Sequence, residues 1–327
     1  VGLGDVYKRQ IVLLLFAFVP QFGAEGVWVS VFTAISAFCN AGFDLFGRFG
    51  AYSSLVPYVN NYYVQAVIMF MIMAGGLGFM VWVELAEYRK KRRLSLHAKV
   101  VLQFSAIFWV GGAVLLALLE WSNPRTMGGL SVPGKIMAAL FQSVSTRTAG
   151  MNTIDLAACS PISKLLMSVL QFIGAAPGST GGGVKVTTFA VLILTIRSVA
   201  QGRDDCVIGG HHIESKTVYR ALTIIVIGAV AAFGSAVVVY YNTAETVSVI
   251  DCIFESCSAF GTVGLSVGVT GQLNTGAKLL YMACMFMGRV GPVSLAISLT
   301  AKPDDNKRKV LPVGHINVCL LYTSDAA

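Results

Sequence analysis

A single pattern occurs three times in this chain, at intervals of about 110 residues. Each copy is an amphipathic run rich in Phe, Ser and Ala that ends in a loop of small residues, closed by a glycine and a bulky apolar residue. The copies are Phe32–Phe43, Phe141–Met151 and Phe254–Leu265. Glycine adopts backbone conformations that other residues resist, so such a loop is suited to lining an ion with its carbonyl oxygens.

Each copy lies between apolar segments long enough to cross a bilayer, which takes about 20 helical residues. The candidate spans are roughly 62–85, 98–121, 162–196, 217–241 and 275–299, with a short apolar stub at 11–20. A hydrophobic content of 55%, a charged content of 12% and a mean hydropathy of +0.72 agree with this interpretation. The predicted fold class is an all-α integral membrane protein, built from tandem helix–pore loop–helix repeats around a single pore.

Basic residues predict how the chain is oriented. The links at 89–99, 197–220 and 302–309 hold 14 of the 24 Lys and Arg residues. Positively charged links stay on the cytoplasmic side of a membrane. The links that contain the pattern (21–61, 122–161 and 242–274) then face outward, and each enters the membrane as a short helix and returns as a loop. Membrane orientation therefore accounts for the net charge of +8, and nucleic-acid binding has no other support.

The three loops are candidate parts of a filter that binds a monovalent cation through backbone carbonyls. Their residues are Cys39, Asn40, Ala41 and Gly42, then Thr148, Ala149 and Gly150, then Thr262, Val263 and Gly264. Arg147 stands beside the second loop, where a bare positive charge would oppose cation flow. We expect it to point away and brace the loop against a carbonyl or carboxylate. Helix packing through small residues explains one copy well, but explains three equivalent copies poorly.

The apolar run at 162–196 is too long for one crossing without strong tilt, and its centre breaks any helix. That centre reads Ala-Pro-Gly-Ser-Thr-Gly-Gly-Gly-Val-Lys over 176–185, with a proline and four glycines. A nucleotide-binding loop would need its lysine directly after the last glycine, and Val184 intervenes. We predict a gating loop below the filter, and a static kink is the alternative. Its candidate gate residues are Gly178, Ser179, Thr180, Gly181, Gly182, Gly183 and Lys185.

Arg289 is predicted to complete this gate. It lies near the middle of the candidate span 275–299, where a charge is costly and needs an interior partner. The exposed carbonyls of the glycine-rich loop are the expected partner, because a guanidinium group offers five donors. A purely structural salt bridge is the competing explanation.

Other classes of function have less support. Seven cysteines without a CxxC pair and four histidines without metal-ligand spacing predict no transition-metal site and no resident cofactor. No cluster of His, Asp, Cys or Ser at one depth suggests an enzyme. A secondary transporter with a substrate site at the membrane midplane is the remaining alternative, although such proteins often contain inverted repeats and these three copies share one orientation.

Four motifs carry a family resemblance. They are Ser145–Gly150, Ala176–Gly183, Ser258–Leu265 and Gly288–Pro292. Together they resemble the Trk/Ktr/HKT superfamily of potassium transporters, and the chain is most similar to the KtrB-type membrane subunit over roughly 11–318. The resemblance implies four repeats with pseudo-fourfold symmetry. The first repeat is then expected to be absent, with a truncated second repeat at 11–86, a third with a broken inner helix at 87–201, and a fourth at 202–318. The segments 1–10 and 319–327 are expected to be extrinsic.

The resemblance also implies a function and partners. It implies potassium uptake by a multi-pass protein of a bacterial plasma membrane. Sodium is implied as a coupled ion in symport or as an alternative cargo. KtrB-type subunits form homodimers, surrounded by membrane lipid, on a cytosolic ring of RCK-type nucleotide-binding subunits. Nucleotide is therefore expected only in that partner. The basic segments 87–99 and 302–309 are candidate contacts with the ring, although orientation alone explains them.

Overall fold

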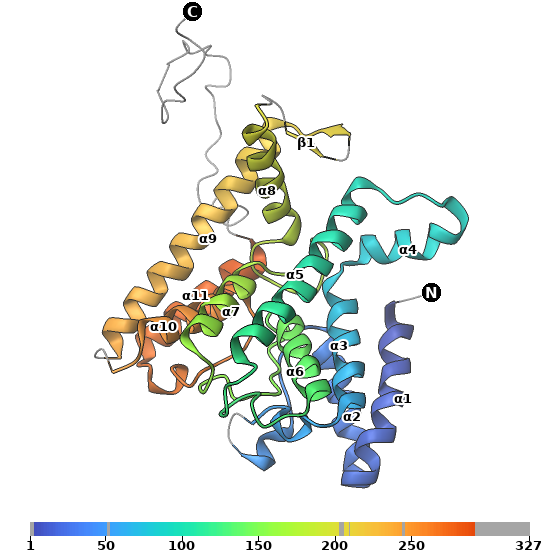
Figure 1. Cartoon of the computed structure of the whole chain (residues 1–327), viewed down its shortest axis with the longest axis vertical. Helices are drawn as coiled ribbons and strands as arrows, with labels where there is room; N and C mark the ends of the chain where they lie inside the picture. Colours follow the sequence, from blue (N-terminus) through green and yellow to red (C-terminus); the bar gives the residue numbers. More distant parts are fainter. Residues whose placement is uncertain (1–2, 51–52, 203–205, 209, 244–245, 292–327) are drawn as a thin grey trace, which may run out of the picture.

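The computed structural model describes residues 3–50, 53–202, 206–208, 210–243 and 246–291, and these are mostly helical (Figure 1). The α-helices are α1 Leu3–Phe22, α2 Glu25–Phe38, α3 Tyr62–Gly76, α4 Phe79–Lys91, α5 Leu96–Glu120, α6 Val132–Ser145, α7 Pro161–Phe172, α8 Val186–Ala200, α9 Ser215–Asn242, α10 Val249–Gly261 and α11 Thr275–Val290. Short 3-10 helices cover Phe46–Phe49, Val56–Tyr58 and Thr270–Gln272. Strands β1 (Val207–Ile208) and β2 (His211–His212) form a small antiparallel hairpin. The predicted all-α class is confirmed.

Two helices in the described part of the chain, α5 and α9, are long and apolar enough to cross a membrane by themselves. They confirm the predicted spans 98–121 and 217–241. The apolar stub 11–20 lies inside the 20-residue helix α1. The structure describes the predicted span 275–299 as far as residue 291. The basic segment 302–309 and the segment 319–327 lie outside the described residues.

The candidate span at 62–85 is broken into two helices, which are long and apolar enough for a membrane span only together. The helices α3 and α4 meet there at a bend of 99°. Gly78 has a φ of +85°, and a side chain at this position would lie 2.5 Å from the carbonyl oxygen of Pro177. The amide of Phe79 donates to the carbonyl oxygen of Gly178 at 3.1 Å. The glycine-rich loop thus fills the corner between the two helices, which hydropathy does not reveal because apolar residues continue through the bend.

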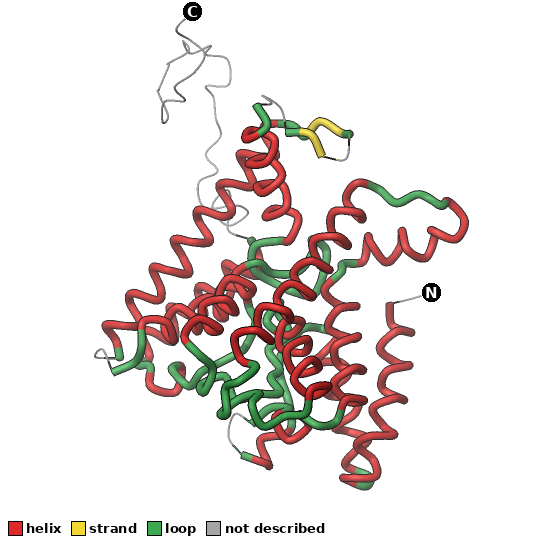
Figure 2. Tube along the Cα trace, viewed as in Figure 1, coloured by secondary structure: helices red, strands yellow, loops and turns green. Residues whose placement is uncertain are grey.

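The short helices α2, α6 and α10 each follow a longer helix and lead into a loop. They pack against α1, α5 and α9 respectively. Packing also joins successive units, because α3 contacts α6 and α7 contacts α10. Figure 2 shows the loops gathered among the helices. This order of helix, short helix, loop and helix is the one that the sequence pattern predicts.

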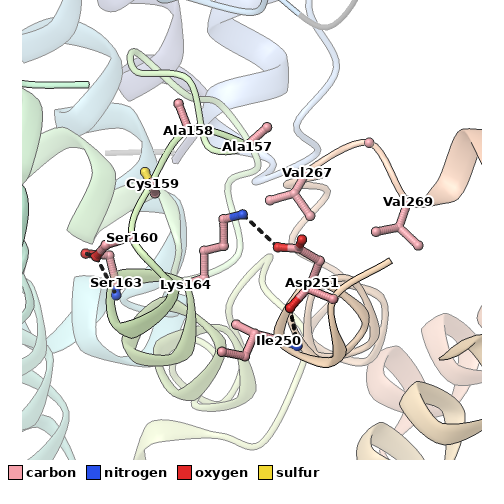
Figure 3. A network of polar contacts seen from close by, with 12 residues as sticks. Ala157, Ala158, Cys159, Ser160, Ser163, Lys164, Ile250, Asp251, Val267 and Val269 are labelled. Carbon is pink, nitrogen blue, oxygen red and sulfur yellow. Dashed lines mark hydrogen bonds and ion pairs between the residues drawn. The ribbon is translucent and has the colours of Figure 1, made fainter. Parts of the chain in front are cut away.

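An ion pair reinforces the contact between α7 and α10. Lys164 on α7 lies 2.7 Å from Asp251 on α10, measured from Nζ to Oδ1 (Figure 3). The side chain of Lys164 is 9% exposed and that of Asp251 is 22% exposed. The pair therefore links two repeats in a largely desolvated position.

The apolar segment 162–196 is broken as predicted: α7 ends at Phe172 and α8 begins at Val186. The ends of the intervening loop are held together, since the amide of Gly174 donates to Val184 O at 2.7 Å and the amide of Val184 donates to Phe172 O at 3.1 Å. A side chain on Gly174 would come within 1.8 Å of the carbonyl oxygen of Gly182. The loop can be this compact only because glycine occupies that position.

Candidate filter and gating loop

The three candidate filter loops share one backbone conformation. Each contains two residues with positive φ, separated by one residue. The pairs are Asn40 and Gly42 (50° and 75°), Thr148 and Gly150 (86° and 82°), and Thr262 and Gly264 (52° and 92°). The first member of each pair is not glycine, so each loop holds a conformation that costs an L-residue roughly 1–2 kcal/mol. Strain repeated at one position of three loops is typical of a functional site.

A serine in the last turn of each short helix fixes the loop that follows. The hydroxyl of Ser36 donates to the carbonyl oxygen of Phe43 at 2.6 Å, and that of Ser258 donates to Leu265 O at 2.7 Å. Ser145 makes the equivalent bond to Met151 O. Sequence analysis included these serines in the pattern but gave them no role. The available signal was their recurrence at one position in all three copies.

Gly150, in the middle loop, lies against both Gly42 and Gly264 of the other two loops. A Cβ atom placed on Gly150 would lie 3.1 Å from the Cα of Gly42 and 2.2 Å from the carbonyl oxygen of Val263. One placed on Gly264 would lie 3.8 Å from the Cα of Gly150. The structure therefore brings together loops that are about 110 residues apart in sequence. The contacts between them involve backbone atoms, so no side chain fits between the loops here.

The electrostatics of this region favour a cation. The C-terminal ends of α2, α6 and α10 lead directly into the loops, and the last turn of a helix carries about half a negative charge. Arg147 is directed elsewhere, because its guanidinium donates to the carbonyl oxygens of Ser105 at 3.3 Å and Gly174 at 3.1 Å. It also lies over the rings of Phe108 and Trp109. The prediction that Arg147 braces the loop against carbonyls is confirmed.

The glycine-rich loop touches the first left-handed residue of every filter loop. The contacts pair Thr180 with Asn40, Gly181 with Thr148, and Gly182 with Thr262. The side-chain amide nitrogen (Nδ2) of Asn40 donates to the hydroxyl oxygen of Thr180 at 2.7 Å. A methyl group on either Gly181 or Gly182 would lie 2.2 Å from the threonine hydroxyl that faces it. Consecutive residues of one loop thus lie against all three filter loops, and two of these contacts require glycine.

Two cationic side chains hold the same loop. Arg289 donates to the carbonyl oxygen of Thr180, and Lys185 Nζ donates to that of Gly181 at 2.6 Å. The amide of Gly183 donates to Gly288 O at 3.1 Å, next to Arg289. The expected contact between Arg289 and a carbonyl of this loop is present. Among the described residues, no carboxylate forms an ion pair with Arg289, so the competing salt bridge is not seen.

The remaining predicted gate residues shape the start of the loop. The hydroxyl of Ser179 donates to Ala176 O at 2.5 Å, which closes a tight turn. Gly178 has a φ of +68°, and its carbonyl oxygen accepts the amide of Phe79 at the corner between α3 and α4. The loop is therefore bound to α3, to α4 and to α11, as well as to the filter loops.

The described chain is helical and apolar, and three loops of one conformation meet between its helices. The family model described as "TrkH: Cation transport protein" matches residues 10–309, and the chain belongs to this family. It is a family of transporters and not of enzymes. The resemblance to the Trk/Ktr superfamily is therefore confirmed, as is a multi-pass location in a membrane.

Individual relatives agree with this assignment. The chain is 37% identical to the potassium/sodium uptake protein NtpJ of Enterococcus hirae, over 89% of this chain and 64% of that protein. It is 34% identical to the Ktr system potassium uptake protein B of Bacillus subtilis (90% and 65% coverage), and 38% identical to that of Vibrio alginolyticus (90% and 63%). The chain thus spans just under two thirds of the length of these relatives.

A solved structure has the same fold. The crystal structure of the potassium transporter TrkH from Vibrio parahaemolyticus matches with a TM-score of 0.68 at 19% identity. The match covers 88% of this chain and 62% of that one. At this level of identity the likeness concerns the arrangement of the helices and loops.

Proposed function

We propose that this chain forms part of a potassium uptake pathway in the plasma membrane. Carbonyl groups at 39–42, 148–150 and 262–264 replace the hydration shell of the ion. The observation that carries the proposal is the contact of Gly150 with both Gly42 and Gly264, in loops with the same pair of left-handed residues. The printed names of the relatives support potassium as the ion.

We also propose that the loop 178–185, together with Arg289, closes this pathway below the filter. The loop lies directly against Asn40, Thr148 and Thr262, so a hydrated ion leaving the filter meets it first. It has few side chains of its own, and the bonds to Arg289 and Lys185 hold its carbonyls in place. Opening then requires the loop to move aside and exchange these bonds for others.

Sodium is the second candidate ion. The relative from Enterococcus hirae is named a potassium/sodium uptake protein, which supports either a mixed pathway or coupling to sodium. Two further relatives are named as parts of a "Ktr system". This name supports the expected cytosolic nucleotide-binding subunits, and we include them and a homodimer in the proposal.

The substitution Gly150→Ser tests the filter. Its Cβ would meet the carbonyl oxygen of Val263 at 2.2 Å, at a φ of +82° that a serine adopts only with strain. We expect rubidium uptake by cells that lack their own potassium uptake systems and express the transporter to fall about tenfold or more. The preference for potassium over sodium should fall with it.

The matched control is Gly111→Ser on α5, where nothing lies within 4 Å of the added Cβ. This variant should transport as the unmodified protein does. Unaltered potassium preference in Gly150→Ser, at normal expression, would remove the filter assignment.

A further inference from the structure

A cavity of about 490 Å³ lies between α5 and α8, away from the filter. Its lining residues are Leu96, Lys99, Val100, Gln103, Phe104, Leu194, Arg197, Ser198, Gln201 and Val207. They belong to the first turns of α5, to the last turns of α8 and the residue that follows it, and to strand β1. These parts lie toward the top of Figure 1, at the end of the molecule where the α4–α5 connection is found. The basic links assign this end to the cytoplasmic side.

Among the lining residues that the structure describes, the charge of this cavity is positive. Lys99 comes from α5 and Arg197 from α8, so two cations approach from different helices. The described lining contains no acidic residue. Neither cation forms an ion pair with any residue that the structure describes. Arg197 also interacts favourably with the negative C-terminal end of α8. This effect does not explain why Lys99, which is on α5, lines the same cavity.

The rest of the lining combines polar and apolar groups. Gln103 and Gln201 offer amide donors beside the two cations, while Leu96, Phe104 and Leu194 line the remaining wall. The outer side of α8 near the cavity is apolar and exposed, since Ile196 is 59% and Val199 60% accessible. In a membrane these side chains face the acyl chains of lipids. A ligand that fits has an anionic head and an apolar body.

We propose that this cavity binds the phosphate headgroup of an anionic phospholipid in the cytoplasmic leaflet. Lys99 and Arg197 donate to the phosphate oxygens, which are strong acceptors for both side chains. The acyl chains lie along the apolar outer surface of α8. Basic pockets between membrane helices on the cytoplasmic side are suited to such headgroups. An acidic protein segment would satisfy the charges but would gain nothing from the adjacent lipid-facing surface.

The test measures lipid binding by the full 327-residue chain in detergent, by native mass spectrometry. Phosphatidylglycerol is titrated against phosphatidylcholine, and inorganic phosphate is used as a separate competitor. Three variants are compared with the unmodified chain. K99Q/R197Q removes both charges of the cavity, and K99R/R197K keeps them. R89Q/K90Q removes two exposed charges from α4, outside the cavity, and so matches the change in net charge.

K99Q/R197Q should bind phosphatidylglycerol about thirtyfold more weakly, and K99R/R197K and R89Q/K90Q should bind it within about twofold of the unmodified chain. Phosphatidylcholine binding should not change in any variant. Equal losses in K99Q/R197Q and R89Q/K90Q would overturn the proposal, because they would show binding by diffuse surface charge. Full competition by millimolar inorganic phosphate would also overturn it, since the site would then be one for a free anion. A thermal unfolding profile of the unmodified chain and of each variant, measured without lipid, confirms that all four proteins are folded.

Discussion

Ser36, Ser145 and Ser258 determine the local shape of the candidate filter. Each hydroxyl bonds the carbonyl of the bulky residue that closes its loop, seven, six and seven residues further along the chain. That carbonyl is therefore occupied by the protein, and the carbonyls of the residues before it are left for other partners. Removing a single hydroxyl would leave a carbonyl without its partner; the bonds of Ser145 and Ser258 are buried and that of Ser36 is partly buried.

We expect Ser36→Ala to lower the potassium selectivity of transport and to destabilise the protein by about 1 kcal/mol, the net contribution of a part-buried hydrogen bond. Competition between rubidium and sodium in uptake measurements reports selectivity, and unfolding in detergent reports stability. Ser30→Ala is the matched control on the same helix, because its hydroxyl bonds Gly26 O one turn back and touches no loop. Equal effects of both substitutions on selectivity would contradict the role given to Ser36.

The sequence indicates which residues belong to the loops, but not what they touch. The pattern predicts Asn40, Thr148 and Thr262 as loop residues because it repeats in sequence. Their contacts with residues 180–182 depend on how far apart the helices are, and that distance is set by packing over the whole repeat. Glycines 181 and 182 are a helix-breaking run in the sequence. Only the structure shows that two threonine hydroxyls exclude any side chain there.

At the scale of elements, the glycine-rich loop and α11 act together. Arg289 near the end of α11 donates to the carbonyl of Thr180, and the amide of Gly183 in the loop donates to the carbonyl of Gly288. A hydrogen bond with a charged donor contributes roughly 1.5–3 kcal/mol. If this bond stabilises the closed loop, then its loss shifts the population toward the open state by about tenfold or more.

Arg289→Ala should therefore raise the resting flux of potassium. Rubidium efflux from preloaded vesicles containing the purified protein measures this flux directly. Arg220→Ala is a suitable control, because Arg220 is an exposed cation on α9. Flux in Arg289→Ala equal to that of the control, with normal expression and folding, would discard the gating role.

The bend between α3 and α4 shows where element prediction fails. Gly75, Gly76 and Gly78 are visible in the sequence, yet glycines are common in straight membrane helices. The bend exists because Gly78 meets Pro177 O and Phe79 bonds Gly178 O, both from a loop about 100 residues away. The break within 162–196 was predictable, because proline and clustered glycines leave that segment unable to form a helix by itself.

At the scale of the whole molecule, the site exists only where repeats meet. No loop contains more than one of the glycines Gly42, Gly150 and Gly264. Their contact depends on α3 packing on α6 and on α7 packing on α10. The repeat pattern predicts the number and order of these units. It does not predict the angles between them, because those depend on side chains such as Lys164 and Asp251 that lie outside the pattern.

The ion pair of Lys164 and Asp251 gives a direct measure of coupling between repeats. Asp251→Asn leaves Lys164 largely buried without its partner, which should lower the free energy of unfolding in sodium dodecyl sulfate by about 2 kcal/mol. A double-mutant cycle with Lys164→Met should then give a coupling energy of about 1 kcal/mol or more. The pair Glu87 and Lys91 is the control, because its side chains are 47% and 68% exposed and such surface pairs contribute about 0.5 kcal/mol or less.

The same variants connect this packing to the site. Because α10 carries the third filter loop, a shift of α10 against α7 moves Gly264 relative to Gly150. Asp251→Asn should therefore reduce potassium preference in uptake measurements, whereas Glu87→Gln should leave it unchanged. A loss of stability with intact ion preference would show that the three loops keep their positions relative to one another without this ion pair. The relative positions of the three filter loops would then depend on their contacts with residues 180–182.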